Sequence, residues 1–202
     1  MVTNESKNSV YAIVLAAGSA ARFGSTKQLA ELDNISLARR ATTLAAKCCE
    51  SRSVLVLGHD WNAVWDACTP LRGFLIINDN YEAGIGTSIA LAVQSIRHVA
   101  SAVLVLLADQ PLITVAHVAA LIDGWSGDEQ EIVATSYADT KGVPALFPAA
   151  CFDQLATLNG DQGARALLND AQFNVRKIVF EDAAVDVDTT ADLARISRNA
   201  RN

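Results

Sequence analysis

The chain has 202 residues, 51% of them hydrophobic, and carries a formal net charge of −6 at pH 7. This composition suffices for a sizeable buried core and excludes disorder over most of the chain. The acidic balance argues against a nucleic-acid partner, because general nucleic-acid binders present a basic face. Any phosphate site must therefore be a local basic pocket. No apolar run is long enough to cross a bilayer, so we expect no membrane partner.

The cysteines and histidines argue against a zinc site. The four cysteines include no Cys-x-x-Cys pair, and the three histidines lie far apart in the sequence. Free thiols in a reducing compartment are the simplest interpretation, and we therefore expect a cytoplasmic protein. Residues 1–9 are polar and are predicted to form a flexible tail, followed by a single domain over residues 10–202.

The first half of the chain alternates between strand and helix patterns. Small and β-branched residues over 10–18 predict a buried first strand that ends in a glycine turn. The patterns that follow are helix 37–49, strand 53–57, a short helix with Trp61 and Trp65 packing into the core, strand 74–77, helix 88–98 and strand 102–108. Such alternation implies right-handed crossovers. The predicted fold class is therefore α/β, a three-layer Rossmann-like sandwich with a mostly parallel central sheet.

The second half is less regular. Strands 131–137 and 143–147 are predicted to pair antiparallel across a turn at 139–142. The remaining predictions are helices 149–158 and 162–168, strand 175–180 and a terminal helix from Asp192.

The loop after the first strand combines two glycines with two cations. Gly18 and Gly24 allow a close backbone approach to a ligand, and Arg22 and Lys27 carry charge that an anion would balance. The spacing matches neither a P-loop nor the Gly-x-Gly-x-x-Gly dinucleotide fingerprint. A polyphosphate cradle is the functional interpretation, and an ordinary connection with surface cations is the alternative.

Asp109 is the acidic residue that the sequence most strongly indicates as part of a functional site. It directly follows the apolar strand 102–108, and ligands in such sheets collect beyond the carboxyl ends of the strands. A carboxylate there is suited to Mg²⁺, which prefers oxygen ligands and bridges phosphates. The alternative is a residue at the start of a helix near Thr114, because Asp and Thr both commonly cap helices.

Three other polar clusters have a functional and a structural interpretation. Asp186 and Asp188 alternate along an extended segment, so one could join Asp109 at the metal, or the pair could cap the last helix. Gly84 and Ser88 could present N–H groups and a hydroxyl to a ligand, or Ser88 could be a plain N-cap. Asp161 precedes a helix pattern and could likewise be only its cap.

The same residues resemble a known family. The pattern from Leu15 to Leu29, with Gly18, Arg22 and Lys27, is similar to the signature loop of nucleotidyltransferases related to molybdenum-cofactor cytidylyltransferase and guanylyltransferase. The similarity continues through further motifs at 78–89, 109–111, 142–147, 160–165 and 186–189. It covers nearly the whole chain, from Val10 to about Leu193.

The resemblance implies roles for individual residues. The backbone of Leu15, Ala16, Ala17 and Gly18 would receive the base and the phosphates. Arg22 and Lys27 would bind the triphosphate as catalytic groups. Asp109 would be catalytic by holding Mg²⁺, with Asp188 as a second metal ligand. Gly84 and Ser88 would lie by the base and the ribose.

The resemblance also implies a reaction. A phosphorylated acceptor such as molybdopterin would attack the α-phosphate of a nucleoside triphosphate and release pyrophosphate. Ala17 is more similar to the cytidylyl branch than to the guanylyl branch, where a second glycine is usual, and this favours CTP. A molybdoenzyme or its maturation factor is the implied protein partner.

Two other function classes stay open at this point. One is an NAD(P)- or flavin-dependent oxidoreductase recruited from this fold, which the missing Gly-x-Gly-x-x-Gly pattern disfavours. The other is a non-catalytic accessory protein that binds a nucleotide or cofactor, which the retained Arg22, Lys27 and Asp109 disfavour.

Overall fold

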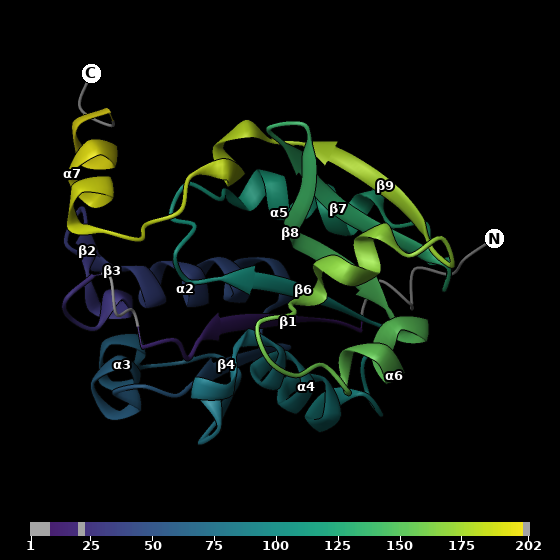
Figure 1. The fold of residues 1–202 in the computed structure, drawn as a ribbon, viewed down its shortest axis with the longest axis horizontal. Helices are drawn as coiled ribbons and strands as arrows, with labels where there is room; N and C mark the ends of the chain where they lie inside the picture. Colours follow the sequence, from purple (N-terminus) through teal and green to yellow (C-terminus); the bar gives the residue numbers. More distant parts are fainter. Residues whose placement is uncertain (1–8, 20–22, 200–202) are drawn as a thin grey trace.

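A seven-stranded sheet forms the centre of the molecule (Figure 1). The computed structural model describes residues 9–19 and 23–199, so the predicted tail falls almost wholly outside them. The strand order is β5-β4-β1-β6-β8-β7-β9. The strands are β1 (Val10–Ala16), β4 (Ser53–Leu57), β5 (Phe74–Ile77), β6 (Ala102–Leu107), β7 (Glu131–Tyr137), β8 (Thr140–Pro148) and β9 (Asn174–Val179).

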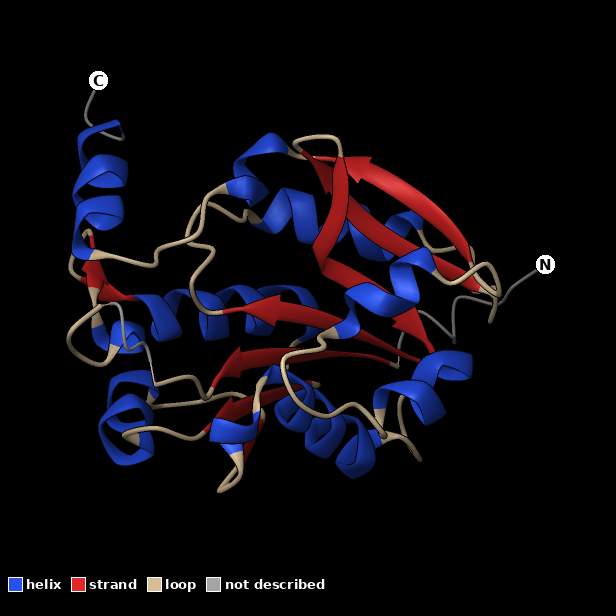
Figure 2. Ribbon diagram, viewed as in Figure 1, coloured by secondary structure: helices blue, strands red, loops and turns tan. Residues whose placement is uncertain are grey.

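Within this sheet, β8 runs against its two neighbours and the other pairings are parallel. Helices cover both faces, as the blue and red elements of Figure 2 show. One face is covered by α2 (Leu37–Cys49), α3 (Trp61–Cys68) and α5 (Val115–Gly124). The other is covered by α4 (Ile85–Ile96), α6 (Phe152–Leu155) and a 3₁₀ helix (Ala164–Asn169). The predicted three-layer, mostly parallel α/β fold is confirmed.

The strands β1 and β6 occupy the middle of the sheet and are buried on both faces. Side chains alternate along them: Ile13 packs toward α4, while Ala12 and Val14 pack toward α2. In their register, Leu15 stands beside Leu107 at the carboxyl ends. The loops that leave these two strands therefore start side by side, and this brings the Gly18 loop next to Asp109.

Several predicted boundaries in the second half of the chain shift. Ala138 and Asp139 both adopt positive φ, at 44° and 58°, so the hairpin turns over these two residues and β8 already begins at Thr140. The predicted helix 149–158 divides into a 3₁₀ helix (Ala149–Cys151) and α6, and the predicted helix 162–168 is the 3₁₀ helix described above.

A third, smaller apolar cluster lies at one edge of the sheet. Helix α7 (Thr190–Asn199) lies beside the small hairpin of β2 (Glu31–Leu32) and β3 (Ile35–Ser36), as Figure 1 shows. Ile196 of α7 is buried together with Leu32, Leu37 and Val187. This packing holds the end of the chain near the carboxyl edge of the sheet. In the described part of the chain, no helix has the length and apolar character that crossing a bilayer requires.

Gly84 provides a test of how tightly the loops above the sheet are packed. Its φ is +110°, and a Cβ atom there would lie 2.2 Å from the carbonyl carbon of Gly160. We expect Gly84→Ala to lower the free energy of unfolding by about 1–3 kcal/mol or more, because strain and a backbone clash coincide. Urea unfolding measures this.

The matched control is Gly163→Ala. Gly163 has φ −76°, and its Cβ would make an ordinary 3.6 Å contact with Ile85. This substitution should change the free energy of unfolding by less than about 1 kcal/mol. Equal stabilities for the two variants would contradict the close approach of the 84 and 160 loops.

Candidate functional site

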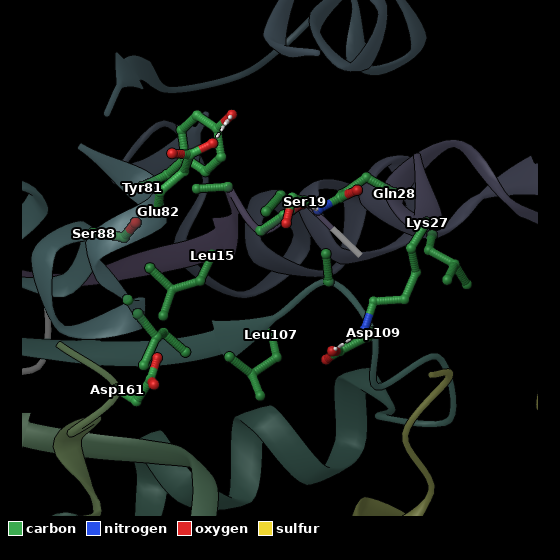
Figure 3. A pocket seen from close by; sticks show the side chains of 17 residues that line it. Leu15, Ser19, Lys27, Gln28, Tyr81, Glu82, Ser88, Leu107, Asp109 and Asp161 are labelled. Carbon is green, nitrogen blue, oxygen red and sulfur yellow. Dashed lines mark hydrogen bonds and ion pairs between the residues drawn. The ribbon is translucent and has the colours of Figure 1, made fainter. Parts of the chain in front are cut away.

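A cavity of about 340 Å³ opens at the carboxyl ends of β1 and β6. This is the sheet edge where the sequence places the candidate residues, and the volume lies in the range of small-molecule sites. Figure 3 shows Tyr81, Glu82 and Ser88 gathered toward one end and Lys27 with Asp109 at the other. Leu15 and Leu107 lie between the two ends. The cavity is therefore elongated. One end carries the charged groups of Lys27 and Asp109, and the other carries Tyr81, Glu82 and Ser88.

Lys27 lies between two carboxylates at the first of these ends. Its Nζ donates to Asp109 Oδ2 at 2.8 Å and to Asp188 Oδ1 at 3.2 Å, and its side chain is 14% exposed. Burial alone would lower the pKa of Lys27, but the charges and hydrogen bonds of Asp109 and Asp188 outweigh it and raise the pKa. Lys27 therefore stays cationic at neutral pH.

The two carboxylates reach Lys27 from different segments. Asp109 follows β6, and its backbone carbonyl accepts from Val187 N at 2.9 Å, which ties it to the segment that carries Asp188. The start of α7 is capped by Thr189, whose Oγ1 accepts from Asp192 N at 3.3 Å, while Asp192 Oδ2 accepts from Thr189 N at 2.9 Å and from Asp188 N at 3.3 Å. The interpretation in which Asp186 and Asp188 cap this helix with Thr189 or Thr190 is therefore right for Thr189 and wrong for the two carboxylates.

The same correction applies to Asp109. The residue that caps α5 is Thr114, whose Oγ1 accepts from His117 N at 3.1 Å. Asp109 lies five residues earlier and lines the cavity instead.

The chemistry of this end fits a divalent cation. Asp109 Oδ1 is buried and has no hydrogen-bond partner, which is costly for a carboxylate oxygen unless something else satisfies it. Asp109 and Asp188 together offer the one or two carboxylates with which Mg²⁺ sites commonly hold the ion, the remaining ligands being waters and substrate phosphates. Among the residues that the structure describes, no group of three His, Cys, Asp or Glu side chains forms a complete metal cage. An ion here would need ligands from the substrate.

Asp186 adds a third carboxyl to this region. Desolvation and the charges of Asp109 and Asp188 raise its pKa to about 6, against the opposing effects of Lys27 and a hydrogen bond from Gln110. The carboxylates therefore repel one another, and Lys27 partly offsets the repulsion.

The other end is shaped by Asn78, which connects the end of β5 to the start of α4. Its Nδ2 donates to Ser88 Oγ and to Thr87 Oγ1, both at 2.9 Å, and its backbone N donates to Leu57 O. Ser88 is buried within α4, which begins at Ile85 after Gly84. Ser88 is therefore not an N-cap, and both Gly84 and Ser88 line the cavity, while their predicted role at a nucleotide stays a prediction.

The Gly18 loop forms one wall. Leu15, Ala16, Ala17 and Gly18 all line the cavity. Gln28 Nε2 donates to Gly18 O at 2.7 Å and His59 N donates to Ala17 O at 3.1 Å, so the start of the loop is held by two hydrogen bonds. Arg22 lies outside the described residues, and its predicted role stays a prediction.

Five polar cavity residues were not assigned a role from the sequence: Ser19, Gln28, Tyr81, Glu82 and Asp161. Asp161 is not the cap that the alternative predicted, because Gly163 stands at that position of the 3₁₀ helix. Tyr81 had one sequence signal in Gly58, where a Cβ would lie 2.6 Å from the Tyr81 ring. Such a glycine marks a close approach, but its partner cannot be identified without the fold.

The raised pKa of Asp186 predicts a pH-dependent stability. A folded-state pKa of about 6 exceeds the ordinary 3.8, so this group destabilises the folded protein increasingly as pH rises from 4 to 6. In a metal-free buffer, Asp186→Asn should raise the free energy of unfolding at pH 7 by about 1 kcal/mol, allowing for solvent screening. The gain should vanish near pH 4. Urea unfolding at both pH values measures this, and equal gains at both would contradict carboxylate repulsion.

The chain is similar to known proteins over most of its length. Residues 12–176 match the family model described as "MobA-like NTP transferase domain". Nicotine blue oxidoreductase of Paenarthrobacter nicotinovorans is 30% identical, over 93% of this chain and 96% of the relative. Purine catabolism protein PucB of Bacillus subtilis is 27% identical, over 92% and 95%.

A solved structure shows the same fold at similar identity. Rv0371c of Mycobacterium tuberculosis is 28% identical and superposes with a TM-score of 0.83, covering 94% of this chain and 97% of the other. A crystal structure of Rv0371c in complex with manganese also matches, at 27% identity and a TM-score of 0.78. Since the family model spans well over half of the chain, this protein belongs to the family of proteins with a MobA-like NTP transferase domain.

Proposed function

We propose that this protein is a divalent-metal-dependent nucleotidyltransferase. The observation that carries the proposal is the position of Lys27 Nζ between Asp109 and Asp188 at one end of a nucleotide-sized cavity. The acceptor phosphate attacks the α-phosphorus of a nucleoside triphosphate, the bond to the β-phosphate oxygen breaks, and pyrophosphate leaves. Such a reaction needs positioning and charge neutralisation more than a protein nucleophile.

The residues divide this work between them. Lys27 carries the positive charge that neutralises the triphosphate, together with Arg22 by the family resemblance. Asp109 and Asp188 would hold Mg²⁺ or Mn²⁺, which supplies further positive charge to the reacting phosphates. Manganese was found bound to the related Rv0371c. The backbone from Leu15 to Gly18 lies along the base and phosphates, and Gly84 and Ser88 lie at the base end.

CTP is the proposed nucleotide. Ala17 lines the cavity with a methyl group, and the resemblance associates this position with the cytidylyl branch. The smaller pyrimidine ring suits a wall that carries a methyl group instead of a second glycine.

Molybdopterin is the proposed acceptor, as the resemblance implies. A second cavity of about 150 Å³ shares Leu15, Ile85 and Leu107 with the first and is lined by Arg165, a cation suited to a phosphorylated group. We place the acceptor there. The product would then pass to a molybdoenzyme or its maturation factor in the cytoplasm.

A second candidate function is an NAD(P)- or flavin-dependent oxidoreductase. The observation in its favour is the relative named nicotine blue oxidoreductase, at 30% identity over 93% of the chain. The dinucleotide fingerprint is missing from the loop after β1, which weighs against this candidate. A third candidate function is a non-catalytic accessory protein that binds a nucleotide. Catalytic turnover distinguishes the transferase and the oxidoreductase from this accessory protein.

Isothermal titration with CTP, GTP, ATP and NADPH, each with and without Mg²⁺ or Mn²⁺, separates these functions. The proposal expects metal-dependent binding of CTP in preference to GTP, followed by pyrophosphate release when the acceptor is added. Binding of NADPH alone would favour the oxidoreductase and overturn the proposal. Binding of CTP without turnover of any phosphorylated acceptor would favour the accessory protein.

Lys27→Ala should weaken CTP binding about 10- to 100-fold. The substitution removes charge-assisted hydrogen bonds to phosphate, each contributing about 1.5–3 kcal/mol. Titration calorimetry measures the dissociation constant. Lys47→Ala is the control, because Lys47 is an exposed lysine of α2 outside the cavity. Similar losses of CTP affinity in both variants would mean that the effect comes from the overall charge of the protein.

Asp109→Asn should lower metal-dependent turnover by about 10²–10³-fold without weakening metal-free CTP binding. The reason is that the substitution removes a carboxylate ligand and retains the shape of the side chain. Pyrophosphate release and calorimetry in EDTA provide the two readouts. Asp66→Asn, on the exposed side of α3, is the control. Full turnover in Asp109→Asn would refute the metal role.

A further inference from the structure

Gln110 joins three separate segments through one amide group. Its Nε2 donates to Ala183 O at 2.9 Å and to Val143 O at 3.2 Å. Val143 belongs to β8, and Ala183 lies in a short 3₁₀ helix (Glu181–Ala184) three residues before Asp186. Gln110 is only 6% exposed. Both of these contacts lie inside the protein, directly beside Asp109.

The segment that follows this 3₁₀ helix is held by individual contacts and belongs to no strand or helix. Between the 3₁₀ helix and α7, residues 185–189 form neither strand nor helix. On the sheet side, Val187 N donates to Asp109 O at 2.9 Å, and the Val187 side chain is fully buried. On the other side, Asp192 anchors Thr189. The spacing between Asp109 and Asp188 depends on these contacts and on Gln110, rather than on a strand register.

The two carboxylates of the proposed cation site repel each other. Lys27 Nζ lies 2.8 Å from Asp109 Oδ2 and 3.2 Å from Asp188 Oδ1, so one ammonium group separates these two negative charges. A triphosphate that draws Lys27 away would leave the carboxylates facing one another until a cation binds. The hydrogen bonds from Gln110 to Val143 and Ala183 join neutral groups, so they remain when Lys27 leaves the carboxylates.

We propose that Gln110 is a positioning residue that keeps Asp109 and Asp188 at the spacing a divalent cation needs. This inference rests on the proposed function and adds a residue to which the family comparison assigns no role. Gln110 acts through the carboxylates and does not bind the ion itself.

The other half of the amide supports this role. Gln110 Oε1 is buried without a hydrogen-bond partner. An apolar side chain of the same length would avoid that unsatisfied carbonyl. The amide is thus a poor choice for packing alone, and its N–H donors account for its presence.

The test is a Mn²⁺ titration of the CTP complex, followed by electron paramagnetic resonance of the free ion. Gln110→Met keeps the length of the side chain and removes both donors. We expect it to weaken Mn²⁺ binding at least tenfold and to leave CTP binding in EDTA within twofold. Gln94→Met is the matched control, since Gln94 Nε2 also donates to a backbone carbonyl, that of Ala156, outside the cavity. This control should bind Mn²⁺ like the wild type.

The outcomes are distinguishable. If the wild-type complex binds no Mn²⁺, the proposed metal-dependent function fails. If the wild type binds Mn²⁺ and Gln110→Met binds it equally well, the positioning role is overturned. If Gln110→Met loses CTP and Mn²⁺ binding together, Gln110 has a general structural role and the inference is again overturned. If Gln110→Met does not fold, Gln110→Asn replaces it, because Asn keeps the amide but is too short to reach Ala183. Weaker Mn²⁺ binding with unchanged CTP binding in this variant would support the positioning role, and unchanged Mn²⁺ binding would overturn it.

Discussion

One ammonium group between two carboxylates determines how this site is built. Lys27, Asp109 and Asp188 come from three distant segments, and their ion pairs join the Gly18 loop, the end of β6 and the approach to α7. The three side chains are 14%, 26% and 39% exposed, and charges that are partly removed from water are costly when they are left unpaired. A ligand that takes the lysine must therefore bring positive charge for the acids, and a triphosphate accompanied by a divalent cation does this.

The sheet supplies the frame for this arrangement. Because β1 and β6 are adjacent and parallel, their carboxyl ends deliver Gly18 and Asp109 to the same edge. Hydrogen bonds from Gln28 and His59 then hold Gly18 and Ala17 in place. Preorganisation of this kind reduces the ordering that ligand binding would otherwise require.

Much of this could be predicted from the sequence because the strongest signals are local. The apolar run of β6 identifies a doubly buried strand, and Asp109 follows it directly. The roles of Ser88 and Asp161 are less local, since a serine or aspartate near a helix start looks the same whether it caps the helix or faces a cavity. The hydrogen bond from Asn78 shows that Ser88 does not cap its helix, and the start of the 3₁₀ helix after Gly163 shows the same for Asp161.

The contacts of Gln110 could not be predicted from the sequence. Nothing in its neighbourhood along the chain indicates that its amide reaches Ala183, 73 residues away. Long-range partners of a buried side chain depend on how loops are laid over the sheet, and periodicity carries no information about that. The same holds for Tyr81, whose ring requires the glycine at position 58.

The separation of Lys27 from Asp188 along the chain is 161 residues. During synthesis, β1, β4, β5 and β6 can all leave the ribosome and pair before the second carboxylate exists. The nascent chain then carries four of the seven strands and a lysine that pairs with Asp109 alone. In the proposed function, the pair of carboxylates that would hold a cation is thus completed only near the end of synthesis, and a prematurely ended chain would lack the second one.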